Sequence, residues 1–438
     1  MWNRGFVIVI VALMALASPS YAKTDLSLHG SNTVGAELAP ALLKGWLVSK
    51  GYKDISEKVQ ADNSLILSAR AANGESLSIE LQTHGSSTGF KALEGAVADI
   101  GMSSRQIKAG EVTRLKSMGK CDTAACEYVV GLDGIAVIVN SANPLNTLTK
   151  AQLRQIFSGE VKNWSELGGA AGAIKVYSLD NLSGTYDTFK SLVMGKGTPL
   201  TGNAVRNESH QFIARQVARE SGAIGFVGLP FVDKAKALSV SDGEAHAIKP
   251  GRFSVATEDY VLARRLFLYL PEIKATKLAR EFVDYAISDA GQAVVARVGF
   301  VSQEIVSGKI ELDDNMPDEY HQLAEEAQRL SLNFRFLKGT IKLDNKAQRD
   351  VERLSSYMAK SDNGGKMLML FGFADANESM PFVSLQLSVD RADLVADLLV
   401  KHGMRPQKVR GYGNAVPIAS NKTEEGRNKN RRVEVWLR

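Results

Sequence analysis

The sequence is poor in cysteine and histidine, and this shortage excludes several kinds of chemistry. It has 2 cysteines and 6 histidines among 438 residues. The histidines are scattered and the cysteines do not form the C-x-x-C pair of a redox protein, so neither a metal-ligand spacing nor a thiol-redox spacing is present. We therefore expect no metal and no other cofactor.

Long apolar runs are also missing, except at the start of the chain. Beyond residue 22 no segment approaches the roughly 20 apolar residues that a membrane-spanning helix needs. At the N-terminus, Arg4 precedes the apolar core "GFVIVIVALMALA", and the small-x-small stretch "SYA" follows. This pattern is typical of a cleaved secretory signal peptide. It predicts that residues 1–22 are removed and that the mature chain, from about Lys23, is exported.

The two cysteines lie close together in the stretch "GKCDTAACEY". Exported compartments are oxidising, and disulfides form and persist there. We predict a bond between Cys121 and Cys126 that closes this polar turn as a local staple.

The charge of the chain is unevenly placed. The formal net charge is +5, and residues 331–438 alone carry 19 Lys and Arg against 12 Asp and Glu. Export argues against nucleic acid as the partner of this basic segment, and an anionic polymer of the cell envelope fits better. The composition, with 45% hydrophobic and 23% charged residues, is that of a globular protein.

The length and the order of sequence patterns predict two or three domains. From residue 23 to 301, strand-like runs such as "IAVIVN" and "AIGFVG" alternate with helical patterns such as "KAQLRQIFSG". This alternation predicts an α/β architecture with mainly parallel sheets. Residues 302–330 are rich in acidic residues and are predicted to be a linker. Residues 331–438 mix strands and helices in one small unit, for which we expect an α+β fold.

Four stretches of the first part place hydroxyl groups at the start of a helix or the end of a strand: "GSNTVGAELAP", "HGSSTGFKAL", "ADIGMSSRQI" and "LSGTYDTFK". Helix N-termini carry unpaired N–H groups and a positive partial charge, so several converging on one place would bind a small oxyanion without a metal. Ser and Thr are also common helix N-caps, so each stretch alone has an ordinary structural explanation. Their joint occurrence favours an anion site.

These stretches, together with "SGAIGFVG" and "SDAGQAVVARVGFVS", resemble the PstS-like periplasmic phosphate-binding proteins. The resemblance implies a two-lobed α/β fold, the type II periplasmic binding protein fold, with the ligand held at helix N-termini between the lobes. It also implies a periplasmic location and an ABC permease as a partner. Carried over position by position, it implies these anion contacts: Thr33, Val34, Ser86, Ser104, Ser183, Gly184 and Thr185.

Two positions depart from the family pattern. Ser104 stands where some family members have an aspartate and others have serine. Leu179 stands where the family usually has an arginine, four residues before the serine of "SGT", so the formal positive charge of the site is missing. Arg105 is a candidate substitute, and an exposed arginine without such a role is the alternative. On this reasoning Leu179→Arg is expected to restore roughly one to two decades of affinity.

The last part of the chain carries a carboxylate and a guanidinium that suit a zwitterion. "GFAD" leaves Asp375 at the end of a strand, and the helix "LSVDRADLVADLL" presents Arg391 near its start. In a shared pocket, Asp375 would take an ammonium group and Arg391 a carboxylate. Spacing alone favours a surface ion pair.

These two stretches and the tail "GYGNAVPIASNKTEEGRNKNRRVEVWL" resemble the OmpA-like peptidoglycan-binding domain. The resemblance implies non-covalent binding of the diaminopimelate residue of the peptidoglycan stem by Asp375 and Arg391. The chain departs from the family in "GFAD", in Ser384 where the family has asparagine, and in one extra residue between the aspartate and the arginine.

Together these features predict a periplasmic binding protein for a small oxyanion, phosphate by resemblance, that is tethered to the cell wall. The alternative is an envelope structural or adhesion protein whose lobes no longer take phosphate. An enzyme is not expected, because Ser183 has no G-x-S-x-G setting and no histidine falls in a recognisable triad motif.

Overall fold

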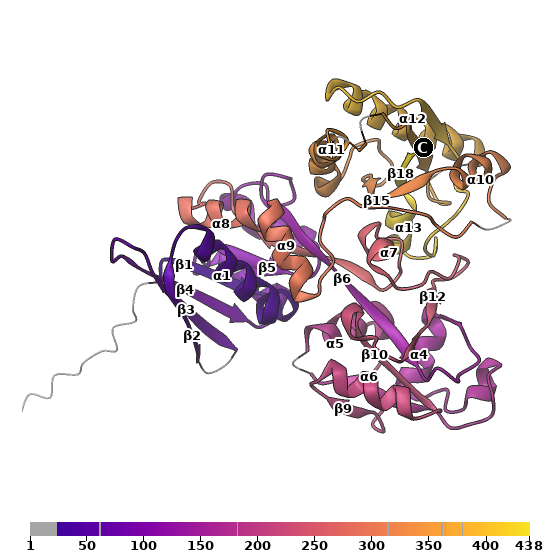
Figure 1. Ribbon diagram of the computed structural model, residues 1–438, viewed down its shortest axis with the longest axis horizontal. Coiled ribbons are helices and arrows are strands. Elements are labelled where there is room, and N and C mark those ends of the chain that lie inside the picture. Colours follow the sequence, from indigo (N-terminus) through magenta and orange to yellow (C-terminus); the bar gives the residue numbers. More distant parts are fainter. Residues whose placement is uncertain are drawn as a thin grey trace, which may run out of the picture.

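The computed structural model describes residues 24–438, except residues 61–62, 182, 313–314, 361, 364 and 379. The expected signal peptide therefore lies outside the described residues. Figure 1 shows two lobes joined by long strands, and a third domain that packs beside them. None of the helices in the described part is long and apolar enough to cross a membrane.

One curled sheet runs through both lobes, in the strand order β2-β3-β4-β1-β5-β13-β6-β10-β8-β9, with β11 added beside β6. In the core of the first lobe, Trp46 packs against Phe282 with ring centroids 5.7 Å apart. The first lobe contains β1 (Leu26–Gly30), η1 (Val34–Leu38), α1 (Ala39–Ser49), β2 (Lys53–Gln60), β3 (Ser64–Arg70), β4 (Ser76–Thr83), α2 (Ser86–Glu94), β5 (Ile100–Ser103), α3 (Ala109–Arg114), η2 (Leu115–Met118), β13 (Ala263–Tyr269), α8 (Lys277–Ile287) and α9 (Asp289–Val298).

The second lobe has its own aromatic core, in which Phe189 stacks on Phe226 with centroids 4.0 Å apart. A small side sheet pairs β12 with β7. The second lobe contains β7 (Thr147–Thr149), α4 (Lys150–Ser158), η3 (Trp164–Leu167), β8 (Lys175–Leu179), α5 (Gly184–Phe189), η4 (Lys190–Met194), β9 (Val205–Asn207), α6 (His210–Arg219), β10 (Ala223–Gly228), η5 (Leu229–Phe231), β11 (Lys236–Ala237), β12 (Ser239–Ser241) and α7 (Arg252–Ala256).

Two long strands connect the lobes. The first half of β6 (Glu127–Val139) pairs with β13 and its second half pairs with β10 of the second lobe. Figure 1 shows β6 running from one lobe into the other. The chain returns to the first lobe through β13, whose register with β6 shifts between Leu266 and Phe267. β6 and β13 therefore form the connection between the lobes.

The sheet is mixed, so the expectation of mainly parallel sheets is wrong. The parallel pairs are β1 with β4 and β5, and β8 with β9 and β10. β2, β3, β6 and β13 pair antiparallel with their neighbours. The βα alternation missed this because the consecutive strands β2, β3 and β4 form hairpins and the connecting strands run against their neighbours.

The third domain is a five-stranded sheet in the order β14-β15-β18-β16-β17, with helices α11 and α12 packed against it. The expected α+β architecture is confirmed. The apolar core of this domain includes Phe334, Leu370 and Val435. Its elements are β14 (Ser307–Gly308), α10 (Asp318–Glu325), β15 (Gln328–Arg335), α11 (Asn345–Met358), β16 (Leu368–Phe373), α12 (Pro381–Lys401), β17 (Lys408–Gly411), α13 (Glu424–Asn430) and β18 (Arg432–Leu437).

The segment 302–330, expected to be a linker, packs on the third domain in its described part. β14 pairs with β15, whose first residues belong to this segment. Tyr320 of α10 is buried against Trp436 and Phe371, with ring centroids 5.8 and 5.5 Å away. The segment therefore contributes apolar packing to the third domain.

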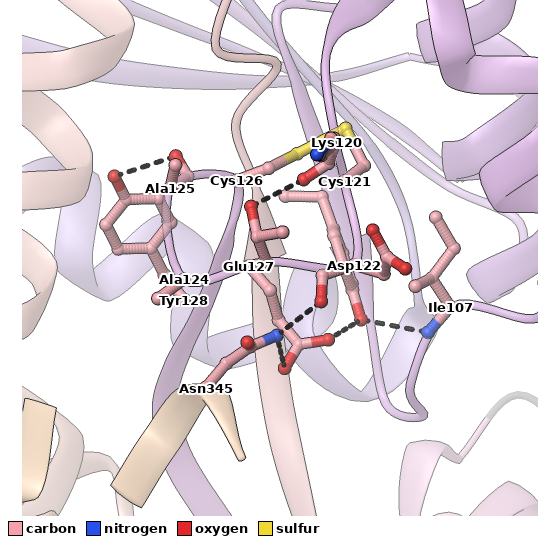
Figure 2. Close-up of a disulfide and its surroundings, with 12 residues drawn as sticks. Ile107, Lys120, Cys121, Asp122, Ala124, Ala125, Cys126, Glu127, Tyr128 and Asn345 are labelled. Atoms are coloured by element: carbon pink, nitrogen blue, oxygen red, sulfur yellow. Dashed lines mark hydrogen bonds between the residues drawn. A yellow bond between two sulfur atoms is a disulfide. The ribbon is translucent and has the colours of Figure 1, made fainter. Parts of the chain in front are cut away.

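The predicted disulfide between Cys121 and Cys126 is present and is confirmed. It packs in a small apolar cluster of the first lobe. Figure 2 shows Asn345 of the third domain reaching the same loop, where its Nδ2 donates to the carbonyl of Asp122 at 3.0 Å and to the Glu127 carboxylate at 3.1 Å. The disulfide therefore closes a loop that the third domain contacts.

Buried ion pairs hold the third domain against the connecting strands. Arg265 of β13 lies 2.9 Å from Glu258 and 2.7 Å from Asp344, the N-cap of α11. Arg329 of β15 lies 2.6 Å from Asp259. Burial alone would raise the pKa of Glu258, but Arg265 and neighbouring cations outweigh it and lower the pKa to about 2. The interface thus keeps this carboxylate charged.

The third domain contacts both sides of the lobe connection. On the first-lobe side, Arg349 donates to the Glu127 carbonyl at 2.6 Å. On the second-lobe side, Lys429 donates to the carbonyl of Tyr260 at 2.9 Å, and Tyr260 belongs to the core of that lobe. The third domain therefore spans the connection rather than hanging from one lobe.

Candidate functional site

The two lobes touch where two of the predicted anion contacts meet. Thr33 follows β1 in the first lobe, and Gly184 begins α5 in the second. The Thr33 hydroxyl donates to the Gly184 carbonyl at 3.1 Å. A β-carbon at position 184 would collide with the Thr33 backbone, so glycine permits this close approach.

An arginine that the sequence reasoning did not single out completes this contact. Arg264 of β13 donates from Nη2 to the Thr33 hydroxyl at 2.6 Å and to the Gly184 carbonyl at 3.1 Å. Its Nε lies 3.4 Å from Asp133 of β6. Asp133 in turn accepts from the hydroxyl of Thr188 at 2.9 Å. The strands that connect the lobes therefore place a largely buried positive charge, 11% exposed, at the lobe contact.

Further predicted hydroxyls gather at the neighbouring strand ends. The hydroxyls of Ser86 and Ser104 lie 3.4 Å apart, and the Ser104 amide donates to the Ser86 hydroxyl at 3.1 Å. The amide of Ser31 donates to the carbonyl of Met102 at 2.9 Å, which ties the loop after β1 to the end of β5. Because β4, β1 and β5 run in parallel, their following loops meet at one sheet edge.

The second-lobe residues sit in the first turn of α5. The Ser183 hydroxyl caps this helix by accepting from the Tyr186 amide at 3.3 Å, so its ordinary N-cap role is observed. Its hydroxyl hydrogen is still available to a ligand, because capping uses the oxygen. Thr185 is half-buried in the same turn, whereas Val34 across the contact is fully buried and offers a ligand its amide alone.

The structure changes the search for the missing positive charge. Leu179, at the end of β8, is fully buried in the second-lobe core. Arg105 binds both oxygens of Glu111, at 2.8 and 2.7 Å, so the suggested substitute is held by a carboxylate. Arg264 places a guanidinium at the lobe contact instead. The sequence does contain a signal for Arg264, because the pair "RR" (Arg264 and Arg265) interrupts an apolar strand. Side chains alternate along a strand, so the two arginines point to opposite faces.

A second carboxylate flanks Arg264. Asp187 of α5 is half-buried, and burial raises the pKa of its carboxyl while Arg264 acts in the opposite direction. A carboxylate near an anion site repels a fully ionised oxyanion and accepts a hydrogen bond from a protonated one. The site therefore combines one guanidinium, several hydroxyls and an acceptor.

In the third domain, Asp375 and Arg391 do not pair with each other at the surface. Both are buried, with exposed fractions of 1% and 0%. Arg391 donates to the two oxygens of Glu378 at 2.7 and 2.6 Å, and Asp375 accepts from Arg431 at 2.8 Å. Burial alone would raise the pKa of Glu378, but the hydrogen bonds from Arg391 outweigh it and lower the pKa. The simple surface ion pair is therefore excluded.

Ser384, at the position where the family has asparagine, is also buried. It belongs to the first turns of α12, the helix that carries Arg391.

A cavity of about 580 Å³ lies away from both sites, between residues 246–257 and the third domain. Its walls include Lys249, Phe253 and Met316, and its buried charges Arg329 and Asp259 pair with each other. Nothing in this cavity matches the predicted anion contacts. Among the described residues there is also no group of three or more His, Cys, Asp or Glu side chains that could hold a metal.

Two lobes joined by crossing strands, with hydroxyls and a guanidinium where they meet, define a two-lobed solute-binding protein. Residues 61–290 match the PBP superfamily domain and residues 335–431 match the OmpA family. The chain therefore belongs to the PBP superfamily and carries an OmpA family domain at its C-terminal side.

Individual relatives agree with this assignment. The chain is 31% identical over 240 residues to Protein SphX of Synechococcus elongatus, covering 52% of this chain and 69% of that protein. It is 30% identical over 257 residues to the phosphate-binding protein PstS of Staphylococcus saprophyticus, covering 56% of this chain and 78% of that one.

Two solved structures share the fold. One is an ABC-type phosphate transport receptor from Vibrio cholerae, with a TM-score of 0.50 and 23% identity over 63% of this chain and 99% of that chain. The other is a possible phosphate binding protein from Planctomyces limnophilus, with a TM-score of 0.53 and 24% identity over 63% of this chain and 92% of that chain.

Proposed function

We propose that this chain binds phosphate between its lobes and is held at the cell wall by its OmpA-like domain. The observation that carries the proposal is the meeting of Thr33, Gly184 and the largely buried Arg264 at the lobe contact. Relatives that are named phosphate-binding proteins support the choice of anion. The predicted hydroxyls of Ser86 and Ser104 lie at the adjoining sheet edge.

Binding would work by exchange of hydrogen-bond acceptors. The Thr33 hydroxyl and Arg264 Nη2 now donate to the Gly184 carbonyl, and a phosphate oxygen is an equivalent acceptor that carries charge. Charged acceptors form shorter and stronger bonds with guanidinium groups than neutral ones do. When the lobes separate slightly, phosphate takes these donors over and gains the amides at the start of α5. No covalent bond is made or broken, so the role is binding rather than catalysis.

Selectivity against sulfate would come from the carboxylate of Asp187. At neutral pH phosphate retains a hydrogen that it can donate to a carboxylate, whereas sulfate has none and leaves two acceptors facing each other. A buried acceptor without a donor is strongly unfavourable. The half-buried Asp187 beside Arg264 therefore favours a protonated oxyanion.

The envelope setting follows from the two parts of the chain. The solute-binding lobes suit the periplasm, where a binding protein would deliver phosphate to an ABC permease. The OmpA-like domain suits a tether to peptidoglycan, with Asp375 holding the ammonium and Arg391 the carboxylate of the diaminopimelate residue. A wall-bound receptor of this kind would act from a fixed place in the envelope.

Calorimetric titration of residues 23–438 with phosphate, sulfate and arsenate tests the anion site. We expect phosphate and arsenate to bind and sulfate to bind more weakly. Thr33→Val removes one donor to a charged ligand, which should weaken phosphate binding on the order of 10-fold. Thr113→Val, on an exposed helical position of α3, is the matched control. Absence of phosphate binding by the unmodified protein would reject the proposal and favour an envelope structural role.

A further inference from the structure

Asp375 and Arg391, the two residues expected to hold a zwitterion, are already paired with charges of the chain itself. Glu378 faces Arg391 in the bidentate geometry that a ligand carboxylate would use. Arg431 faces Asp375 at 2.8 Å, where a ligand ammonium group would lie. All four side chains are buried. An external carboxylate can reach Arg391 only after Glu378 has left.

The two internal charges are held with different firmness. Arg431 has a further partner, Glu424, to which it donates at 2.9 Å, so it keeps a counter-charge if Asp375 turns to a ligand. In addition to Arg391, two main-chain amides donate to the Glu378 carboxylate. The Gly339 amide lies 3.0 Å away, and the Asp375 amide lies at a long 3.4 Å. Glu378 is therefore the half that a competing carboxylate can displace.

The residues just before Glu378 are exposed and are held by hydrogen bonds: the Ala376 amide donates to Asn421 Oδ1 at 3.1 Å and the Asn377 amide to Asp375 Oδ1 at 2.8 Å. Just after Glu378, Met380 and Phe382 are 77% and 78% exposed, so these large apolar side chains add little packing. The ion pair of Glu378 with Arg391 is buried, whereas Ala376 and Asn377 beside it are exposed. A segment with few buried apolar contacts is expected to open locally at a low cost in free energy.

We propose that Glu378 is an intramolecular competitor for the carboxylate of an amino-acid ligand, so that wall binding requires residues 376–378 to move away from Arg391. The proposal rests on the proposed tether and specifies how it is controlled. The ligand class is a free amino-acid head, an ammonium and a carboxylate on one carbon, as diaminopimelate carries. The affinity for the wall then depends on the difference in binding free energy between the ligand carboxylate and the Glu378 carboxylate at Arg391.

The test is sedimentation of residues 23–438 with purified diaminopimelate-type sacculi. Glu378→Gln keeps the shape and removes the competing charge, so we expect at least about 10-fold tighter binding, the effect of one charge-assisted contact. Glu352→Gln, on an exposed position of α11, is the matched control and should bind as the unmodified protein does. Adding Arg391→Ala to Glu378→Gln should abolish the gain.

A second measurement avoids any folding defect of the variant. In the unmodified protein, amide hydrogen exchange of residues 376–378 should rise when soluble diaminopimelate-containing muropeptides bind. Equal sedimentation of the unmodified protein and Glu378→Gln, or unchanged exchange in this segment on binding, overturns the competitor role and leaves the tether intact. If no variant sediments, including Glu378→Gln, the tether itself falls and the inference falls with it.

Discussion

The contact between the lobes and the contact between the third domain and the lobes are built from different chemistry, although they meet at neighbouring residues of β13. At the lobe contact, Nη2 of Arg264 donates to a hydroxyl and a carbonyl oxygen, both neutral, while its Nε lies 3.4 Å from Asp133 of β6. One residue further, Arg265 binds the carboxylates of Glu258 and Asp344. Strand alternation sends the two guanidinium groups to opposite faces of the sheet.

This difference indicates which contact a ligand can replace and which contact is permanent. Neutral acceptors can be replaced by a charged oxyanion with a gain in free energy. Asp259 and Arg329 form a buried ion pair, and removing one member leaves an uncompensated charge. The lobe contact is therefore suited to opening for a ligand. The third-domain contact is suited to keeping the domain in place across the connecting strands.

The largest effect is expected when the third-domain contact is broken. Asp259→Asn removes the charge that faces Arg329 at 2.6 Å. Loss of one partner of a buried ion pair typically costs about 3–5 kcal/mol, so the free energy of unfolding should fall by that amount. Equilibrium unfolding in urea measures it, with Asp284→Asn on the exposed face of α8 as control. If Asp259→Asn leaves the urea midpoint of unfolding unchanged, this ion pair does not hold the third domain in place.

A crossed pair of variants separates the two contacts. Arg264→Met should weaken phosphate binding by roughly 10- to 100-fold, because a charge-assisted contact is lost. Arg265→Met should leave phosphate affinity close to that of the unmodified protein and lower the stability of the docked third domain. Calorimetric titration and urea unfolding of both variants give the comparison. Loss of phosphate binding in Arg265→Met would contradict these separate roles of Arg264 and Arg265.

The smallest effect concerns pH and Lys429, which donates to the Tyr260 carbonyl at the third-domain contact. Burial lowers the pKa of Lys429 from 10.5 to about 8. Between these values the unfolded chain holds a proton that the folded chain has released, so stability rises with pH from 8 to 10.5. The rise is at most about 1.4 kcal/mol per pH unit.

Unfolding in urea at pH 8 and pH 9 measures this slope. Lys429→Met should flatten it, because the titrating group is gone while the apolar stem is kept. Other groups that titrate in the window contribute equally to both proteins and cancel in the difference. If the free energy of unfolding rises with pH equally in both proteins, Lys429 does not release a proton on folding and this prediction is wrong.

Much of the fold was visible in the sequence because its signals are local. Strand and helix patterns predicted an α/β part and a small α+β domain, the family resemblance implied two lobes, and the spacing of Cys121 and Cys126 predicted their bond. Hydroxyls at helix starts pointed to Thr33 and Ser86, whose loops do meet others of the predicted set. Such signals lie within a few residues of one another and need no knowledge of long-range packing.

The expected benefit of Leu179→Arg shows where local reasoning ends. The prediction assumed that position 179 was open to the ligand, yet Leu179 is fully buried in the second-lobe core. An arginine there has to remove a charge from water or disturb packed neighbours, both of which cost stability. Burial depends on the assembly of the whole lobe, which the four residues before "SGT" do not encode.

By itself the sequence determined the domain types, the local disulfide and the hydroxyl-bearing turns, because each is set by neighbours along the chain. Only the tertiary structure decided which charges meet. Arg264 reaches Thr33 across 231 positions of sequence, and Glu378 rather than a ligand faces Arg391. Electrostatic partners are chosen by distance in space and by burial, and both arise only when the strands between the lobes and the third domain have packed together.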